Sequence, residues 1–155
     1  MKAILTTLTE ENKAAVYEQI IDPIWDKCRD GFALDQLNAF EKPLIIAQII
    51  EDSINGGGIN SYFYNTCNKY IADGLAAFQT LGMTHVYDIF KQAVDAFPAS
   101  EIPGDLETCR QLIEALPDEN PADEKWNALT NEFYDLHDYI LDKKLEYIRE
   151  SMERG

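Results

Sequence analysis

Residues 43–58 read PLIIAQIIEDSINGGG, and this segment determines how the rest of the chain can fold. Its apolar side chains fall on nearly every side of a helix, which is typical of a helix buried at the centre of a protein. Pro43 suits the first turn of such a helix. The glycines that follow let the chain turn through positive φ. We therefore expect a buried central helix that ends at Gly56-Gly57-Gly58.

The residues before this segment predict one further helix. Thr7 and Glu10 have the spacing of a capping box, which marks the start of a helix. Pro23 is expected to kink this helix, because proline removes a hydrogen-bond donor from its interior. Asp30-Gly31 is expected to end it.

The residues after the glycines predict an antiparallel helical hairpin. Asn60 is placed to cap a short aromatic helix. Residues 68–81 then show helical periodicity and end at Gly82, a typical C-cap residue. Thr84 is expected to cap the partner helix, which Pro98 ends. A very short turn would therefore join the two helices of this hairpin.

Two more helical segments complete the chain. Residues 105–116 predict one helix, and Asn120-Pro121 begins the last segment, which the pattern allows to be one helix or two. No run of alternating polar and apolar residues is long enough for a strand. We therefore expect an all-α fold over residues 1–155, a single compact domain of about six to eight helices around a central hairpin.

The cysteines and the N-terminus favour a cytoplasmic protein. Cys28, Cys67 and Cys109 are odd in number and far apart, so free thiols in a reducing cytosol are the favoured interpretation. The N-terminal residues are too interrupted for the apolar core of a signal peptide. No apolar run is long enough to span a membrane.

The charge of the chain excludes some partners. There are 28 acidic residues against 13 basic ones, a net charge of −15. Nucleic acids and anionic membrane surfaces need a basic patch, so neither is an expected partner. Residues 95–142 hold 13 of the acidic residues and only Arg110 and Lys125 as bases, an excess of 11 negative charges. The charge is thus concentrated, whereas the glycine and aromatic centre is neutral.

Part of this charge forms a regular pattern near the end of the chain. If the last segment is one helix, its carboxylates fall within roughly 120° of arc at spacings of three or four residues. The residues of this acidic face are Glu132, Asp135, Asp138, Asp142, Glu146 and Glu150, with Glu153 beyond them. The face is either a solvated helix surface or a surface that attracts the basic groove of a DNA-binding protein, and both interpretations stay open.

No pattern of catalytic or metal-binding residues is present. The glycines are not followed by the Lys-Ser/Thr pair of a phosphate-binding loop, and no nucleophile has an orienting partner. His85 and Asp88 share one helical face, but two ligands do not make a metal site. We therefore predict no catalytic residues, no metal, no cofactor and no enzyme. A bound metal at His85 and Asp88 would reverse this, as would a cleft that gathers carboxylates with raised pKa values.

Residues 54–65, which read INGGGINSYFYN, resemble the signature of a bacterial domain family of largely unknown function. The usual form is Asn-Gly-Gly-Phe-x-Gln-Tyr-Phe-x-Asn, and here Gly56 replaces the first Asn and Ser61 replaces the Gln. The resemblance covers roughly residues 40–150. It implies an all-helical fold, and the best characterised relative is a dimeric DNA mimic whose acidic surface occupies the DNA-binding face of a transcription factor. A homodimer therefore stays open beside a monomer.

The resemblance leads to two hypotheses about function. The first is a non-enzymatic DNA mimic, whose acidic face presents carboxylates to a basic DNA-binding protein. The alternative is a helical module, of a regulatory or immunity type, that binds a small molecule or peptide through the signature region. The residues concerned in the alternative are Asn55, Gly57, Gly58, Tyr62, Phe63 and Asn65. A purely structural role in the turn between two helices is the favoured interpretation of these residues.

Overall fold

The computed structural model describes residues 1–154, and within them it contains helices and no strands. This confirms the predicted all-α class. The helices are α1 (Lys2–Leu5), α2 (Lys13–Lys27), the 3₁₀ helix η1 (Leu34–Gln36), α3 (Glu41–Thr66), α4 (Ile71–Thr80), α5 (Thr84–Asp95), α6 (Leu106–Glu114), α7 (Pro121–Tyr134) and α8 (His137–Arg154). No helix within these residues combines the length and the apolar character needed to cross a bilayer.

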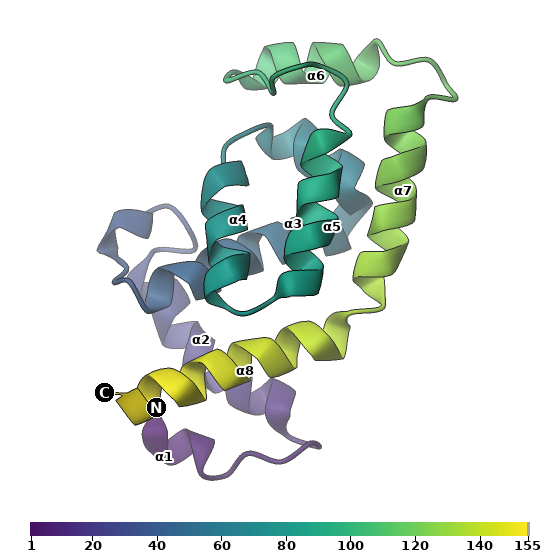
Figure 1. Ribbon diagram of the computed structural model, residues 1–155. Helices are drawn as coiled ribbons and strands as arrows, with labels where there is room; N and C mark the ends of the chain where they lie inside the picture. Colours follow the sequence, from purple (N-terminus) through teal and green to yellow (C-terminus); the bar gives the residue numbers. More distant parts are fainter. Residues whose placement is uncertain (155) are drawn as a thin grey trace.

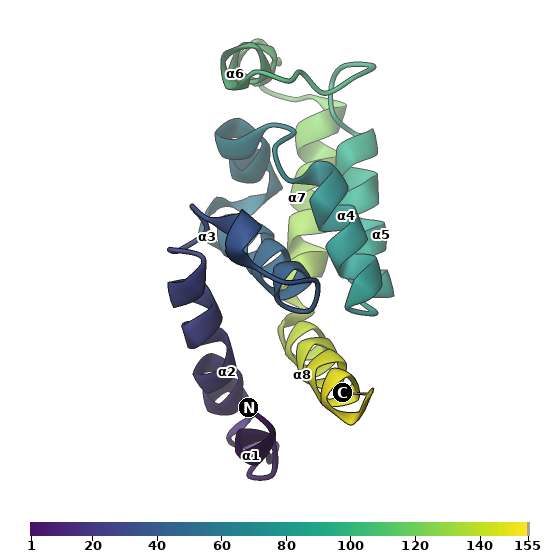
Figure 2. The same cartoon turned by 90° about the vertical axis from the view of Figure 1, so that its left-hand side faces the viewer.

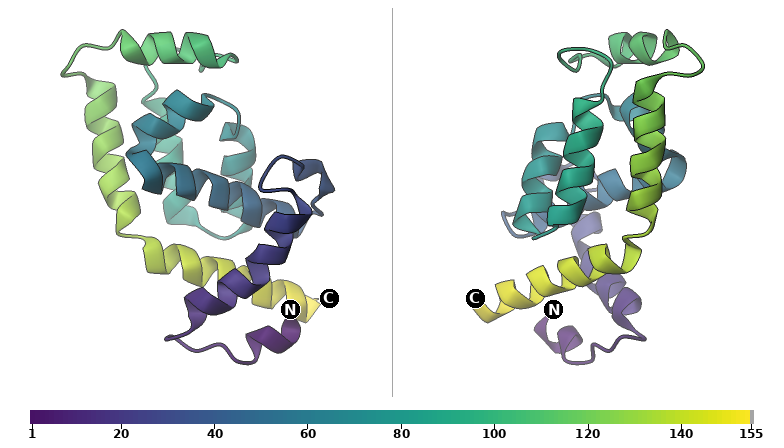
Figure 3. Two further views of the ribbon diagram at one scale, coloured as in Figure 1. Left: turned by 180° about the vertical axis from the view of Figure 1, so that it is seen from behind. Right: turned by 45° about the vertical axis from the view of Figure 1, so that its right-hand side comes forward.

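Helix α3 lies at the centre of the fold, as its composition predicts. It packs against α4, α6 and α7, and α2 crosses its first half (Figures 1 and 2). Its apolar side chains from Leu44 to Ile54 are almost all buried. Helices α6, α7 and α8 run along the outside, and α8 passes beside α2 at the end of the molecule that holds both termini (Figure 3).

The expected turn at the glycines occurs at Gly58 alone. Helix α3 continues through Gly56 and Gly57, and Gly58 then adopts φ 84° and ψ 178°. This conformation is accessible almost only to glycine. Beyond the break, the N–H of Ile59 donates to the hydroxyl of Thr130 on α7 at 3.1 Å. The break therefore changes the direction of α3 and fastens it to α7.

The hairpin of α4 and α5 is confirmed, with Gly82 at its turn. Gly82 has φ 70°, the Met83 N–H donates to the Phe78 carbonyl at 2.9 Å, and the Gly82 N–H donates to the Gln79 carbonyl at 3.0 Å. These bonds form a Schellman motif. The capping role expected of Thr84 is wrong, because Thr84 is already the first helical residue and makes no side-chain cap.

Two predicted caps elsewhere are also wrong. Helix α2 begins at Lys13, so Thr7 and Glu10 do not form its capping box. Thr9 and Asn12 instead bond reciprocally ahead of it, with the Thr9 N–H at 2.6 Å from the Asn12 amide oxygen. The side chain of Asn60 donates to Asp123 at 2.6 Å and caps no helix.

The last segment forms two helices, α7 and α8. Asn120 caps α7 by accepting a hydrogen bond from the Asp123 N–H at 2.8 Å, and Pro121 occupies the first turn, as predicted. The helix ends at Tyr134, and α8 starts at His137 in a new direction (Figure 1). Of the two arrangements that the sequence leaves open, the structure has two helices, so the acidic face does not lie on a single helix.

The free-thiol interpretation holds only for Cys28, which is buried and unpaired. Cys67 and Cys109 form a disulfide with their Cα atoms 5.9 Å apart. It joins the end of α3 to α6. No local pattern points to this pair, because 42 residues separate the two cysteines. The cysteines were expected to be free thiols, which favoured a reducing cytosol. Because two of them form a disulfide, the cysteines no longer support that location.

Substitution of Gly58 should destabilise the fold by its effect on the backbone. A Cβ at Gly58 would meet Thr130 at 3.5 Å, an ordinary contact, so the strain comes from φ 84°. We expect Gly58→Ala to lower the free energy of unfolding by roughly 1–3 kcal/mol in urea denaturation. The control Gly56→Ala sits in open space on the helix and should raise that free energy by about 0.5–1 kcal/mol. Equal effects of the two variants would contradict the Gly58 geometry.

Reduction of the disulfide should also lower stability. Cross-linking Cys67 to Cys109 restricts the unfolded chain, and this restriction is worth about 2–4 kcal/mol for a loop of this length. We expect a loss of that size in urea denaturation when a reductant is present. Thiol titration of the denatured chain should find Cys28 alone before reduction. If all the cysteines react without reductant, the disulfide is absent from the protein in solution.

Candidate functional site

The residues of the acidic face lie on two helices. Glu132 is near the end of α7 and Asp135 follows it, whereas the other members lie on α8. All six of these carboxylate side chains are exposed. The face therefore bends at the elbow between α7 and α8, on the outside of the molecule (Figure 1).

Lysines neutralise the part of the acidic face on α8. The Lys13 ammonium lies 2.9 Å from Asp142, 3.1 Å from Glu10 and 4.0 Å from Asp138. Its hydrogen bond to Asp142, followed by the one to Glu10, raises the pKa of Lys13 well above the usual lysine value. Glu146 pairs with Lys143 at 3.3 Å. These contacts leave Glu150, Glu132 and Asp135 as members of the face without an ion pair within residues 1–154.

Most carboxylates of residues 95–142 have no ion pair in the part of the chain that the structure describes. Asp95, Asp138 and Asp142 are the exceptions. Arg110 neutralises none of the others, because its Nε donates to the Tyr64 carbonyl at 2.9 Å and its guanidinium lies over the Tyr64 ring. The exposed carboxylates without an ion pair are Glu101, Asp105, Glu107, Glu114, Asp118, Glu119, Glu124, Glu132 and Asp135. They follow α6 and α7 along the outer edge of the fold.

The signature residues are divided between the core and the surface. The Tyr62 and Phe63 rings are completely buried, and Phe63 stacks on Trp126 with 5.0 Å between ring centroids. Asn55 and Asn65 are exposed, and Gly57 and Gly58 lie at the break in α3. The structure therefore does not gather these residues around one cavity. Their visible role is to pack the core and to turn the chain.

His85 and Asp88 lie exposed on the first turns of α5. The His85 and Tyr139 rings pack edge to face, with 6.1 Å between their centroids. Within residues 1–154, no cluster of three or more His, Cys, Asp or Glu side chains is placed to hold a metal ion.

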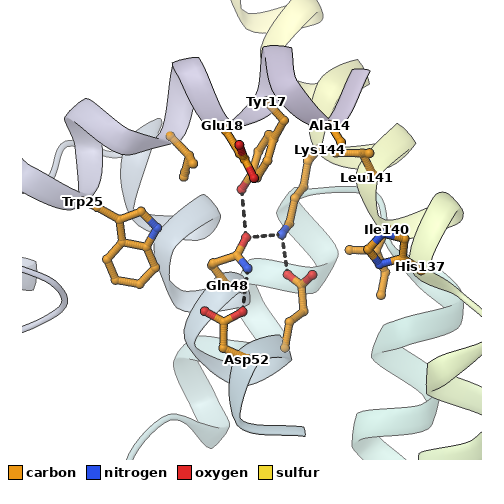
Figure 4. A pocket seen from close by; sticks show the side chains of 12 residues that line it. Ala14, Tyr17, Glu18, Trp25, Gln48, Asp52, His137, Ile140, Leu141 and Lys144 are labelled. Carbon is orange, nitrogen blue, oxygen red and sulfur yellow. Dashed lines mark hydrogen bonds and ion pairs between the residues drawn. The ribbon is translucent and has the colours of Figure 1, made fainter. Parts of the chain in front are cut away.

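The structure contains a cleft that the sequence did not indicate, with a volume of about 260 Å³. It lies between α2, α3 and α8, and Figure 4 shows the side chains that line it. The lining residues are Ala14, Tyr17, Glu18, Ile21, Trp25, Gln48, Glu51, Asp52, His137, Ile140, Leu141 and Lys144. Glu18, Asp52 and His137 are exposed, so the cleft reaches the surface.

A polar network forms the floor of this cleft. The Lys144 ammonium donates to the side-chain oxygen of Gln48 at 2.7 Å and lies 5.0 Å from the centre of the Tyr17 ring. The Tyr17 hydroxyl donates to the same Gln48 oxygen at 3.2 Å. The Gln48 amide nitrogen in turn donates to Asp52 at 2.8 Å. Helices α2, α3 and α8 thus meet through one hydrogen-bonded group of side chains (Figure 4).

A buried ion pair stands beside this network. Glu51 and Lys144 are only 6% and 2% exposed, and Lys144 Nζ lies 2.5 Å from Glu51 Oε2. That oxygen is in contact with the ammonium but outside hydrogen-bonding geometry. Burial raises the pKa of Glu51, and the positive charge of Lys144 opposes the rise. Burial also raises the pKa of the Tyr17 hydroxyl, and the negative charges of Glu51 and Asp52 add to that effect.

Sequence reasoning missed this cleft because it depends on a long-range contact. Glu51 and Asp52 directly follow an apolar run in the sequence. One signal was available: Gln48 and Glu51 place polar groups one turn apart on a helix that is otherwise apolar. A buried carboxylate needs a cation, but nothing local points to Lys144.

Comparison with known families finds one match. The model of the DMP19-like protein family matches residues 35–151 of this chain. Searches of curated proteins and of solved structures find no match. The matched region includes α3 to α7 and most of α8, whereas α2 precedes it. Two walls of the cleft therefore lie inside the family region and one lies outside it.

Removal of Lys144 should destabilise the protein in a pH-dependent way. Lys144→Met leaves the Glu51 carboxylate buried without its cation, a loss of about 3–5 kcal/mol near pH 8. The folded state would then hold the Glu51 proton to a higher pH than the unfolded chain does. The free energy of unfolding of the variant should therefore fall as pH rises from the Glu51 pKa of the unfolded chain to the raised Glu51 pKa of the folded state. The loss of stability relative to wild type should accordingly be smaller near pH 5 than near pH 8.

The neighbouring lysine provides the control. Lys143 and Glu146 have 33% and 54% exposed side chains, so Lys143→Met should change the free energy of unfolding by about 0–1 kcal/mol. Urea denaturation of both variants at about pH 5 and pH 8 measures the difference. A loss for Lys144→Met that does not vary with pH would contradict a buried, uncompensated Glu51.

Proposed function

Because the chain belongs to the DMP19-like protein family, we propose that it is a non-enzymatic protein that binds a basic DNA-binding protein in place of DNA. The carboxylates of the outer edge would occupy the positions of phosphates. The partner would be a protein whose DNA-binding surface is rich in lysine and arginine.

One observation carries this proposal: the exposed carboxylates of α6, α7 and the α7–α8 elbow lack ion pairs within residues 1–154. An acidic face whose members were paired with lysines would have little charge to offer a partner. Here the pairs involve mainly α8 and α2, and the outer edge along α7 stays negative. Glu124, Glu132 and Asp135 are exposed members of this edge.

The expected binding is driven by long-range attraction. Complementary charge raises the rate of association and directs the partner to the acidic edge. Salt screens this attraction, because the Debye length falls from about 10 Å at 0.1 M to roughly 3 Å at 1 M. Binding should therefore weaken strongly with salt.

The cleft is compatible with a protein that is not an enzyme. It gathers carboxylates, one of them with a raised pKa, which is the arrangement that would reopen the question of catalysis. Yet Glu51 Oε2 is fully buried against Lys144, so it has no free approach to a substrate proton. The lining contains no serine, threonine or cysteine nucleophile. The cleft therefore fits binding better than catalysis.

Neutralising the acidic edge should weaken capture of the partner. The immobilised protein should retain a basic DNA-binding protein from lysate at about 0.1 M salt and release it near 1 M. The retained protein is identified by mass spectrometry. DNA that this partner binds should release it from the immobilised protein by competition. The triple variant Glu124→Gln, Glu132→Gln, Asp135→Asn should bind it about tenfold more weakly, as expected when several close charge pairs are lost.

A matched control separates this edge from total charge. Glu11, Asp22 and Asp26 are exposed on or just before α2 and have no ion pair within residues 1–154. Their replacement by Gln and Asn removes the same charge and should leave capture nearly unchanged. Glu10 is unsuitable here, because it shares Lys13 with Asp142. Equal losses in both triple variants, or capture that salt does not reverse, would contradict the proposal.

A further inference from the structure

The cleft between α2, α3 and α8 has an excess of negative charge. Its lining includes the carboxylates of Glu18, Glu51 and Asp52. Against these three acidic residues, the lining contains one lysine, Lys144, and no arginine. Glu18 and Asp52 have no ion pair within residues 1–154, and both are exposed at the mouth. The excess persists even if Glu51 holds a proton, because two carboxylates then face one ammonium.

Lys144 is already engaged and does not offer its charge to a ligand. Its ammonium donates to Gln48, touches Glu51 and lies against the Tyr17 ring. These protein groups surround the ammonium, and Lys144 is only 2% exposed. The open capacity of the cleft lies in acceptors, namely the oxygens of Glu18 and Asp52. A ligand that fits them must donate hydrogen bonds and carry positive charge.

Apart from His137, the remaining lining residues of the cleft are apolar. Ile21 and Leu141 face it from α2 and α8, and the half-buried Trp25 side chain extends toward it from α2 (Figure 4). An indole ring attracts cations to its face as well as apolar groups. The volume of about 260 Å³ is slightly below the usual range for small-molecule sites, so a ligand would be small.

We infer that this cleft binds an organic cation, namely an ammonium or guanidinium group carried on a small apolar body. Glu18 and Asp52 receive the charged group, and Trp25, Ile21 and Leu141 contact the body. The cation comes either from a free amine or from a lysine or arginine side chain of another protein. This inference does not depend on the acidic edge of α7.

Trp25 supplies a direct readout of binding. The other tryptophan, Trp126, is fully buried and donates its indole N–H to the Ala93 carbonyl at 2.9 Å, so its emission should stay constant. Titration with phenethylamine should change the Trp25 fluorescence and saturate. Phenethyl alcohol and 3-phenylpropionate have the same body with a neutral or negative end. Each should bind at least about tenfold more weakly than phenethylamine.

Two variants of equal charge locate the binding site. Glu18→Gln with Asp52→Asn should weaken phenethylamine binding by about tenfold or more. Both side chains are exposed, and asparagine keeps the acceptor that Gln48 uses, so the fold should survive. Glu11→Gln with Asp22→Asn removes the same charge outside the cleft and should leave the affinity unchanged. Circular dichroism and thermal melting confirm that each variant is folded.

A competition experiment identifies the source of the cation. N-acetylarginine methylamide is an arginine side chain with blocked ends, and it is added to the complex with phenethylamine. Displacement supports the inference with a protein side chain as the source. Failure to displace, together with preferential binding of phenethylamine, supports it with a free amine as the source.

Several outcomes would overturn the inference. Equal binding of phenethylamine and phenethyl alcohol would show a purely apolar site, and preference for 3-phenylpropionate would show that Lys144 selects anions. Equal losses in the two double variants would show a general charge effect. No saturable response to phenethylamine, or a response that persists in Trp25→Phe, would show that the cleft binds no such cation.

Discussion

The contact between Lys144 and Glu51 joins the last helix of the chain, α8, to the central helix α3. A carboxylate at the middle of the buried helix α3 is tolerable only if a cation reaches it, and Lys144 on α8 is that cation. Helix α8 must therefore cross α3 at this point. The break between α7 and α8 makes the crossing possible, because α8 leaves α7 in a new direction (Figure 1).

Several of the cations are committed to contacts, and this leaves the surface more acidic than the composition alone implies. Lys144 is buried with Glu51, Lys13 holds α2 to α8, and Arg110 fastens α6 to the backbone at Tyr64. Each of these residues stabilises a junction between helices. Because these cations are used at the junctions between helices, they do not neutralise the carboxylates of the outer edge.

Local patterns predicted the elements whose ends are set by local chemistry. Asn120 caps α7, and Gly82 closes the hairpin, because side-chain caps and positive φ need only a few neighbouring residues. Thr7 shows the limit, since its spacing to Glu10 fits a cap that the chain does not use. The Cys67–Cys109 bond and the cleft could not be predicted, because both join residues that only the tertiary fold brings together.

The family match begins at residue 35, so α2 precedes the matched region. Yet Tyr17 on α2 covers the ammonium of Lys144 and shields it and Glu51 from water. With water in place of α2, the same two residues would form an ordinary surface pair with little effect on either charge. Helix α2 thus sets the dielectric environment of a charge pair whose members both lie in the matched region.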